Sequence, residues 1–330
     1  MVRFSLIVPV YNRPDEVDEL LDSLTKQTST DFEVVIVEDG SQVPCKEVVE
    51  KYVGRMLISY YTKPNGGPGQ ARNFGAAKST GDYLIVLDSD CILPPGYIRA
   101  VEDELTATDA DAFGGPDKAS DSFTDVQKAI NYTMTSFFTT GGIRGGKKKM
   151  DKFYPRSFNM GIRRSVWDAL GGFSKMRFGE DIDFSIRLYE SGYTVALFPS
   201  AWVYHKRRTD WRKFFRQVYN FGIARINLYK KYPDSLKAVH CLPAVFTLGV
   251  LFLLICSLFC VYALLPLALY FLLVLIDAAR QNKSLKIGLL AVVASFIQLT
   301  GYGLGFLSAV WNRIILKKEE FSAFEKTFYK

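Results

Sequence analysis

The chain has 330 residues, and its 41 Lys and Arg against 34 Asp and Glu give a formal charge of +7. That length fits one large domain with an additional part. The charges are unevenly spread, because residues 241–276 and 287–312 contain no Asp, Glu, Lys or Arg. A helix that spans a bilayer needs roughly 20 apolar residues, so this composition excludes a purely soluble protein. The ordinary charge content of the remainder excludes intrinsic disorder.

The cysteine spacing and the N-terminal sequence bear on where the first part of the chain resides. The five cysteines form no CxxC pair, which speaks against a disulfide framework or a zinc site. The apolar stretch that precedes Asn12 is only about seven residues long, too short for a signal peptide. We therefore expect the first 200 residues to stay in the cytoplasm.

Two periodicities alternate in the first third of the chain. Short apolar runs predict strands, and helical spacing of apolar residues predicts helices between them. This alternation indicates an α/β fold with a mostly parallel sheet and helices on both faces. The predicted strands cover 4–10, 33–37, 57–61 and 83–87, and the predicted helices cover 15–24 and 68–78.

Polar clusters follow three of these strands directly. They are residues 11–13, 38–41 and 88–90. Each cluster alone would be compatible with a plain turn. Parallel α/β sheets bind ligands at the carboxyl ends of their strands, so three clusters in this position favour a functional site.

The middle of the chain contains two basic segments. Residues 139–152 read TTGGIRGGKKKMDK and fit either a mobile loop that meets phosphate or lipid, or a solvated linker. Residues 205–231 carry nine Lys or Arg against the single acid Asp210, with aromatic residues on one helical face. This pattern favours a helix in a membrane interface, and packing in a protein core is the alternative.

The apolar C-terminal part predicts membrane segments. Residues 241–279 are too long for one straight helix across a hydrocarbon core of about 30 Å. We expect a hairpin with its turn near 264–266, returning the chain to the basic cytoplasmic side. The third segment, 286–312, contains Gly301, Gly303 and Gly305. It either crosses the membrane or breaks and re-enters, and the sequence leaves both open.

Three acidic or imidazole features carry candidate chemistry. Asp88 and Asp90 follow an apolar strand, so both carboxylates could face one hard cation such as Mg²⁺ or Mn²⁺. Three acids within residues 180–183 begin a predicted helix. They could simply favour the helix dipole, the interpretation that spacing alone prefers, or provide a general base. His205 is one of two histidines and is either a packing residue or a nitrogen ligand.

Several motifs in this order resemble the family 2 glycosyltransferases of the GT-A fold. The resemblance covers about residues 3–225. The motifs that carry it are VPVYNRP (8–14), VVIVEDGS (34–41), NGGPGQARNFGAAKSTGDYLIVLDSD (65–90), FNMGIRRSVWDALGGF (158–173), GEDIDFSIRLYESGY (179–193) and VYH (203–205).

The resemblance implies a nucleotide-sugar donor, for which we expect a UDP-sugar, and inversion at the anomeric carbon. It implies that Asp181 is the catalytic base beside Glu180, and that His205 completes a metal site with Asp88 and Asp90. Direct inversion needs one base and a Lewis acid at the leaving diphosphate, without a second nucleophile. The implied donor-binding residues are Pro9, Tyr11, Asp39, Arg72, Asp88, Ser89 and Asp90, with Asp39 at the nucleobase.

The acceptor side departs from one branch of the family. We expect acceptor contacts from Asn159 and Met160 and from Gln217 and Phe221. Processive synthases of the family carry QxxRW, whereas residues 217–221 read QVYNF. This difference and the small membrane part favour a single addition to a lipid-linked (polyprenyl-diphosphate) glycan over a processive polysaccharide synthase.

The sequence thus predicts a metal-dependent transferase at the cytoplasmic face of the inner membrane, in surface polysaccharide or glycoconjugate synthesis. Its expected partners are a nucleotide sugar, a lipid-linked acceptor and membrane lipid, without nucleic acid. A polyprenyl-phosphate sugar synthase and a non-catalytic nucleotide-sugar-binding scaffold are alternatives. A Rossmann oxidoreductase is excluded because no GxGxxG follows the first strand. The expected domains are 1–204 (catalytic), 205–238 (interfacial helix), 239–316 (membrane) and 317–330 (charged tail).

Overall fold

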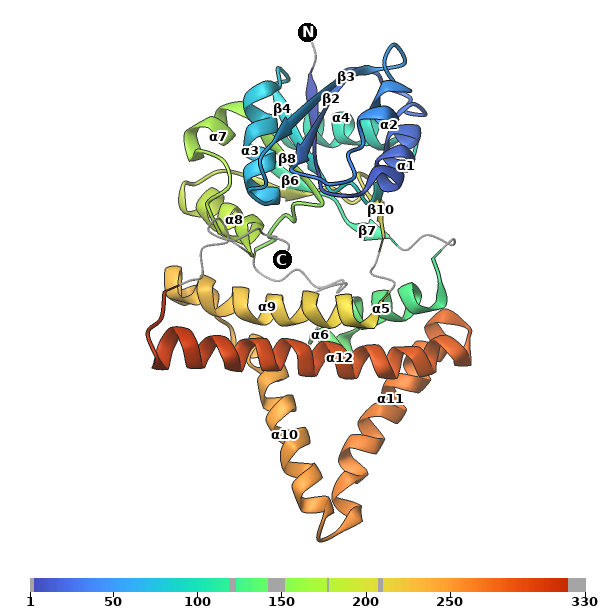
Figure 1. The fold of residues 1–330 in the computed structure, drawn as a ribbon, viewed down its shortest axis with the longest axis vertical. Helices are drawn as coiled ribbons and strands as arrows, with labels where there is room; N and C mark the ends of the chain where they lie inside the picture. Colours follow the sequence, from blue (N-terminus) through green and yellow to red (C-terminus); the bar gives the residue numbers. More distant parts are fainter. Residues whose placement is uncertain (1–2, 119–122, 142–151, 177, 207–209, 320–330) are drawn as a thin grey trace. The chain divides into compact units, whose positions relative to one another are not determined.

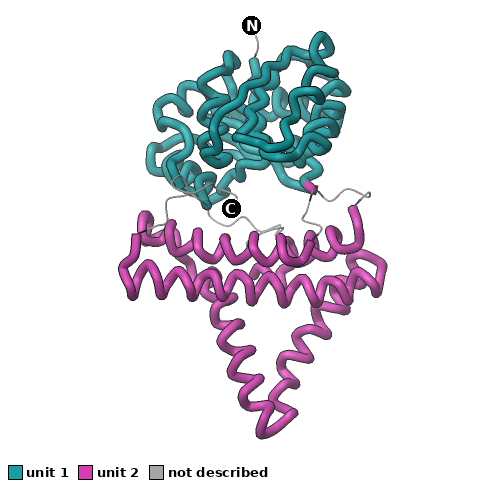
Figure 2. Tube along the Cα trace, in the orientation of Figure 1, with its two compact units in different colours: residues 1–120, 151–205, 322–330 teal, residues 121–150, 206–321 magenta. Residues whose placement is uncertain are grey.

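The computed structural model describes residues 3–118, 123–141, 152–176, 178–206 and 210–319. The chain forms two compact units (Figure 2). The first comprises residues 1–120, 151–205 and 322–330, and the second comprises 121–150 and 206–321. The expected catalytic domain of 1–204 is thus interrupted by a segment that belongs to the second unit. Most of the predicted loop 139–152 and of the tail 317–330 lies outside the described residues.

A seven-stranded sheet of order β3-β2-β1-β4-β8-β6-β9 lies at the centre of the first unit (Figure 1). The first four of these strands are parallel to one another, and β8 is antiparallel to both β4 and β6. The predicted α/β fold with a mostly parallel sheet is therefore confirmed. The strand bounds are β1 (Phe4–Val10), β2 (Phe32–Asp39), β3 (Leu57–Lys63), β4 (Tyr83–Leu87), β6 (Ala112–Gly114), β8 (Asn159–Arg163) and β9 (Val195–Leu197).

A smaller sheet of order β5-β10-β7 completes the first unit. Its strands are β5 (Cys91–Ile92), β7 (Asp117–Lys118) and β10 (Val203–His205). In its antiparallel pairing, His205 lies opposite Cys91. This register brings the end of β10 to the segment that directly follows β4.

Helices cover both faces of the large sheet (Figure 1). Within β1, Leu6 and Val8 pack with α1, α2 and α4, whereas Ile7 packs with α3, α7 and α8. A strand buried on both faces has a continuous apolar sequence, which is why β1 could be predicted with its observed bounds. The helices are α1 (Pro14–Leu24), α2 (Lys46–Glu50), α3 (Pro68–Lys78), α4 (Tyr97–Thr108), α7 (Arg164–Leu170) and α8 (Glu180–Glu190).

The second unit is helical. In Figure 1, α9 and α12 run side by side, and α10 and α11 converge on a common apex. Two helical stretches, Val261–Asn282 and Leu285–Ile315, are long and apolar enough to cross a membrane. Its helices are α5 (Asp125–Thr135), α6 (Phe137–Thr140), α9 (Trp211–Lys231), α10 (Leu242–Ser257), α11 (Leu265–Asn282) and α12 (Leu285–Ala309), and a π-helical turn (Val310–Ile315) follows α12.

The predicted hairpin is present, but its turn lies earlier than predicted. Helix α10 ends at Ser257, and a short 3₁₀ turn (Val261–Leu264) leads into α11. Pro266 lies in the first turn of α11, where its missing N–H breaks no helical hydrogen bond. The proline therefore begins the second helix and does not mark the turn.

The glycines of α12 allow close helix contacts and do not break the helix. A Cβ at Gly301 would lie 2.7 Å from Val218 of α9, and one at Gly305 would overlap the backbone of Tyr219. A Cβ at Gly303 would overlap the side chain of Thr247 in α10. Helix α12 continues unbroken past all three glycines, so of the two alternatives left open for 286–312, the break is not observed.

The apolar face of α9 is buried inside the second unit. Phe214, Val218 and Ile226 are buried among residues of α5, α10 and α12. For the apolar face of α9, the structure therefore agrees with packing in a protein core, which was the alternative prediction for residues 205–231. The basic side chains of α9 remain mostly exposed.

Candidate functional site

The three predicted polar clusters meet at one edge of the sheet. Strands β2, β1 and β4 are parallel neighbours, so their carboxyl ends lie together. Asn12 links the first two clusters, because its backbone amide donates a hydrogen bond to Ser41 Oγ at 2.8 Å. The first and third clusters are joined by Arg13 Nη1, which donates to Asp90 Oδ2 at 3.1 Å.

Asp88, Asp90 and His205 converge beside this edge. His205 Nε2 lies 3.1 Å from Asp90 Oδ1 and 3.8 Å from Asp88 Oδ2. The imidazole stacks on the ring of Phe158 with centroids 4.8 Å apart, which fixes its orientation. The sequence separates His205 from the aspartates by more than a hundred positions, and the small sheet brings them together.

These donor atoms suit a hard divalent cation. Ligands roughly 2.1–2.2 Å from a six-coordinate ion lie about 3.0 Å apart when adjacent and about 4.3 Å apart when opposite. The observed 3.1 and 3.8 Å fall within that range. Cys91 Sγ is within 4.8 Å of the Asp90 and His205 donors, but burial raises the pKa of this thiol well above its usual value. The set that fits Mg²⁺ or Mn²⁺ is therefore the oxygen and nitrogen set.

Arg13 balances the negative charge of the cluster. Its guanidinium lies 2.5 Å from Glu16 Oε2 as well as 3.1 Å from Asp90. Burial opposes the charged form of Arg13, but the attraction of Asp90 and Glu16 outweighs it, so the pKa of Arg13 is raised. Arg13 thus supplies a fixed positive charge at the edge where a diphosphate would be neutralised.

Arg72 connects the aspartate pair to the acidic start of α8. The side chain is buried, and it donates from Nη2 to Asp88 Oδ1 (2.6 Å) and from Nη1 to Glu180 Oε1 (3.1 Å). Burial would lower the pKa of Arg72, but its two acidic partners raise it. Burial and the adjacent charge of Asp181 raise the pKa of Glu180 to about 7, although Arg72 opposes that shift.

Asp181 occupies a different environment from its acidic neighbours on α8. Its Oδ1 accepts from the amide of Ile182 at 2.8 Å, and its Oδ2 lies 3.5 Å from Arg156 Nη1. Asp183 is fully buried and bonded to Arg187, so it stabilises the helix. Of the acids on α8, only Glu180 and Asp181 therefore adjoin the candidate site.

Asp39 is bonded to the loop that precedes α3. Only 1% of the residue is exposed. Its carboxylate accepts hydrogen bonds from Lys63 Nζ (2.6 Å) and from the amides of Gly66 (2.9 Å) and Gly67 (2.8 Å). Asn65 donates to the Asp39 carbonyl at 2.8 Å. Asp39 thereby holds residues 63–67 against the end of β2, and its contact with a nucleobase stays a prediction.

The remaining donor-site residues lie at the same edge. Pro9 and Tyr11 are partly exposed at the end of β1, and Ser89 is buried between the two aspartates. Their positions are compatible with the predicted donor site, and their contacts with a donor stay predictions.

The predicted acceptor residues separate into two groups. Asn159 and Met160 are fully buried in β8, and Asn159 bonds Tyr97 (2.6 Å) and the carbonyl of Ala201 (2.8 Å). Burial and these internal bonds give the pair a packing role, and their predicted contact with an acceptor stays a prediction. Gln217 and Phe221 lie on α9 in the other unit, and their assignment stays a prediction.

Sequence reasoning assigned no role to Lys63, Arg156 or Phe158. Lys63 and Phe158 acquire their contacts only through tertiary packing, with no local sequence signal. Arg156 lies two positions before the FNMGIRR motif. Nothing in that spacing indicates that its side chain would lie beside Asp181. Arg13 could have been found, because it lies inside the first polar cluster.

Comparison with known proteins identifies the fold of this site. The sequence model described as Glycosyl transferase family 2 matches residues 5–171. An uncharacterized glycosyltransferase of Haemophilus influenzae is 46% identical over 91 residues, covering 27% of this chain and 30% of that protein. The poly(ribitol-phosphate) beta-N-acetylglucosaminyltransferase TarS of Staphylococcus aureus is 40% identical over 94 residues, 27% of this chain and 16% of TarS. The matched segments thus span under a third of these relatives.

Two solved structures have a similar fold. The crystal structure of S. aureus TarS 1-349 gives a TM-score of 0.50 at 22% identity, covering 68% of this chain and 66% of that one. The mannosyltransferase PcManGT from Pyrobaculum calidifontis, in complex with GDP-Man and Mn²⁺, gives 0.59 at 17% identity, with coverage of 94% and 88%. At these identities the likeness concerns the fold.

Proposed function

Because the chain belongs to glycosyl transferase family 2, we propose that this glycosyltransferase moves a sugar from a nucleotide-sugar donor to a lipid-linked glycan with inversion. The observation that carries the proposal is the convergence of Asp88, Asp90 and His205 next to the Glu180–Asp181 pair. Arg72 bonds to both groups and holds them in one frame. Inversion in one step requires this combination of a cation site and a base.

The chain's own residues divide the chemistry between them. Asp88, Asp90 and His205 would hold Mg²⁺ or Mn²⁺, which supplies Lewis-acid stabilisation of the leaving diphosphate. Arg13 adds a fixed positive charge beside Asp90. Asp181 accepts the proton of the acceptor hydroxyl while that oxygen bonds to the anomeric carbon and the bond to the diphosphate breaks. Arg72 holds Glu180, which leaves Asp181 as the base.

The donor is a nucleotide sugar, for which we favour a UDP-sugar. TarS and PcManGT are both named as sugar transferases, and PcManGT was solved with a nucleotide sugar. The polar edge formed by the ends of β1, β2 and β4, with carboxylates for a cation and Arg13 beside them, suits such a donor. The lipid-linked acceptor is supported by the two apolar helical stretches of the second unit. A catalytic unit at the cytoplasmic face of the inner membrane follows from this assignment.

A polyprenyl-phosphate sugar synthase is the second candidate. The observation that favours it is Arg156, whose guanidinium lies 3.5 Å from Asp181 and is partly exposed. A cation beside the reacting position suits an anionic acceptor such as a lipid phosphate. Such an acceptor needs no strong base, so the two functions differ in their dependence on the Asp181 carboxylate.

The test is nucleoside diphosphate release by the full chain in lipid nanodiscs, over a panel of nucleotide sugars, with lipid diphosphate-linked glycan or lipid phosphate as acceptor. We expect release with one donor, loss of activity in excess chelator and recovery with Mn²⁺ or Mg²⁺. Full activity in excess chelator would refute the cation site. Failure to turn over any donor with either acceptor would refute the transferase proposal. Asp181→Asn should lower transfer to the glycan by roughly 10²–10⁴-fold and spare transfer to a phosphate.

A further inference from the structure

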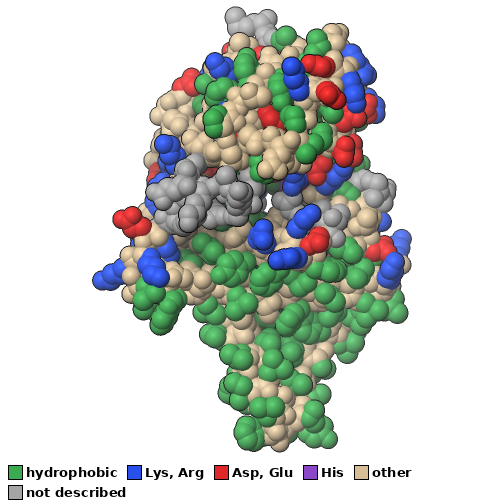
Figure 3. Space-filling view, viewed as in Figure 1, with side chains coloured by type: hydrophobic (Ala, Val, Ile, Leu, Met, Phe, Trp, Pro, Cys, Tyr) green, Lys and Arg blue, Asp and Glu red, His purple; other side chains and the backbone are tan. Residues whose placement is uncertain are grey.

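The hairpin formed by α10 and α11 exposes an unusually apolar surface (Figure 3). We propose that the second unit inserts into a bilayer from one side only. The hairpin ends within the hydrocarbon layer without crossing it, and α9 and α12 lie parallel to the membrane surface. The proposal rests on the membrane association in the proposed function, and it is independent of sugar transfer.

The apex of the hairpin exposes large apolar side chains. Leu258 is 81% exposed, Phe259 is 90% exposed and Val261 is 67% exposed. Residues 241–276 contain no Asp, Glu, Lys or Arg. A turn that emerged into water on the far side would carry these side chains into an aqueous phase at a cost of about 25 cal/mol per Å². The apex is therefore suited to hydrocarbon.

The charge-free part of each arm is shorter than the hydrocarbon layer, although the second arm as a whole, Val261–Asn282, is long enough to cross it. Helix α10 has 16 residues, which corresponds to about 24 Å at a rise of 1.5 Å per residue. The apolar part of the second arm, residues 261–276, has the same length. The arms diverge from the apex (Figure 1), so they are tilted and reach less deep than their length. A hydrocarbon core is about 30 Å thick, so the apex stops inside it.

Helix α12 passes the length and composition test for a membrane span, but its partner forbids crossing. It packs along α9, which carries six Lys or Arg in 21 residues. A helix cannot traverse hydrocarbon beside such a neighbour, because each charge costs several kcal/mol there. The face of α12 away from α9 exposes an apolar stripe that suits the membrane surface, made of Leu285, Leu289, Val293, Phe296 and Leu304.

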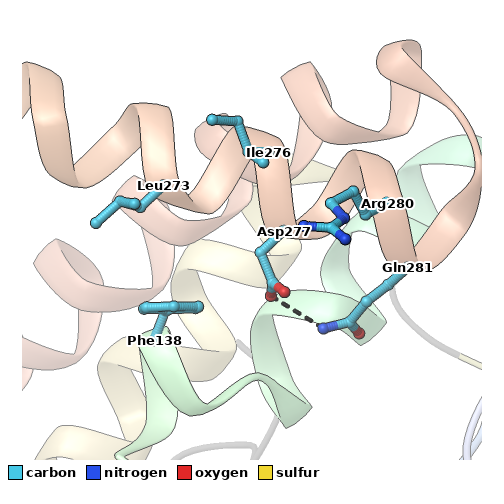
Figure 4. Close-up of a pocket in the computed structure, with 6 residues that line it drawn as sticks. All are labelled: Phe138, Leu273, Ile276, Asp277, Arg280 and Gln281. Carbon is cyan, nitrogen blue, oxygen red and sulfur yellow. Dashed lines mark hydrogen bonds between the residues drawn. The ribbon is translucent and has the colours of Figure 1, made fainter.

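The base of the second arm shows where the hydrocarbon ends. Asp277 is the first charged residue after the apolar run, and it accepts hydrogen bonds from Tyr132 (2.6 Å) and Gln281 (2.9 Å). A cavity of about 430 Å³ opens here (Figure 4). Its lining changes from apolar to polar along α11 and consists of Phe138, Leu273, Ile276, Asp277, Arg280 and Gln281. This change of polarity fits the boundary between acyl chains and headgroups.

The native thiol of Cys260 provides a direct test, because it is exposed at the apex. The full chain is expressed in bacterial membranes with Cys241→Ala and Cys256→Ala, while Cys45 and Cys91 stay as buried thiols. Sealed vesicles of both orientations are treated with a membrane-impermeant maleimide, before and after detergent. As a control, a variant that also carries Cys260→Ala measures the labelling of the remaining thiols, Cys45 and Cys91. Arg280→Cys in that control variant reports the base of the hairpin.

We expect Cys260 to be protected in both orientations and labelled only after detergent. Arg280→Cys should be labelled in one orientation without detergent. A fluorophore on Cys260 should be quenched more strongly by nitroxides deep in the acyl chain than by headgroup nitroxides.

Three results would overturn the proposal. Labelling of Cys260 from the face opposite to Arg280→Cys would show that the hairpin crosses. Labelling of both from one face would show that the apex is not embedded, and protection of Arg280→Cys in both orientations would place the boundary elsewhere. Nucleoside diphosphate release from the same vesicles is scored separately, so loss of the proposed function and loss of this topology are distinguishable.

Discussion

Replacing Asp181 with Asn tests the assignment of the base most directly. The change preserves the size of the side chain, and an amide oxygen can still accept the hydrogen bond from the Ile182 amide, now 2.8 Å long. What disappears is the capacity to take a proton. General-base catalysis contributes on the order of 10²–10⁴ in rate, which corresponds to about 3–5 kcal/mol of activation free energy. Transfer to a hydroxyl acceptor should fall by that factor.

The adjacent acid supplies a matched control. Glu180→Gln is the same isosteric change one residue earlier, but Glu180 is held by Arg72 at 3.1 Å. If Glu180 only positions Arg72, and Arg72 in turn positions Asp88, the rate of transfer should fall by less than about tenfold. That corresponds to a rise in activation free energy of less than about 1.4 kcal/mol.

The assay is the rate of transfer measured beside donor affinity. The predicted donor contacts lie on Asp39, Asp88 and Asp90, so Asp181→Asn should lower kcat and leave the donor Kd within twofold. Near-normal transfer to the glycan, or a loss that follows weakened donor binding alone, would refute the role of Asp181. Asp183 could not then take over, because it is fully buried and bonded to Arg187. The base would have to be Glu180.

Three further predictions address the metal, the pH response and the helix contacts. His205→Ala should weaken the affinity for Mn²⁺, measured by calorimetry, by at least roughly tenfold. Even the loss of a residue that only hydrogen-bonds to a metal ligand has an effect of that size. An unchanged affinity would show that His205 is not a ligand. Burial and Asp181 raise the pKa of Glu180 from 4.5 to about 7, so the unfolded chain ionises first as the pH rises. The thermal midpoint of the wild type should therefore fall relative to Glu180→Gln between about pH 4.5 and 7, and parallel curves would contradict the shift. Gly222→Ala would place a Cβ 2.6 Å from the Phe306 amide and should cost about 1–3 kcal/mol by thermal unfolding in detergent. Gly249→Ala, whose Cβ would meet no described atom within 4 Å, should be neutral or stabilising, and equal losses for the two would contradict the close crossing.

The parallel sheet was predictable because its signals are local. Strands β1 and β4 are buried on both faces, and their apolar runs begin and end where the strands do. Helix α3 begins at Pro68, a residue that favours the first helical position. Strand β2 was predicted one residue too short at its start and two too short at its end, because Glu38 and Asp39 look like a polar turn but pair in the ladder with β3.

The site was predictable to the extent that it depends on strand ends. Parallel neighbours bring Asp39 and the Asp88–Asp90 pair to one edge, whatever the details of packing. The arginine contacts depend on tertiary structure and carry no local signal. Arg72 meets Glu180 across 108 positions of sequence and meets Asp88 across 16. Periodicity and spacing cannot predict such pairs, which is why only the resemblance placed Arg72 in the site.

Hydropathy could not decide the path of 286–312, because it measures how apolar a helix is and not where its apolar faces point. A spanning helix and a helix lying between a protein surface and a membrane surface have the same composition. The neighbouring element distinguishes the two. Gly301 and Gly305 bring α12 close to α9, and α9 carries charges along its length that hydrocarbon would not accept. In the proposed topology, the glycines that raised the alternative of a broken helix are the residues that would keep α12 out of the bilayer interior, because they hold it against α9.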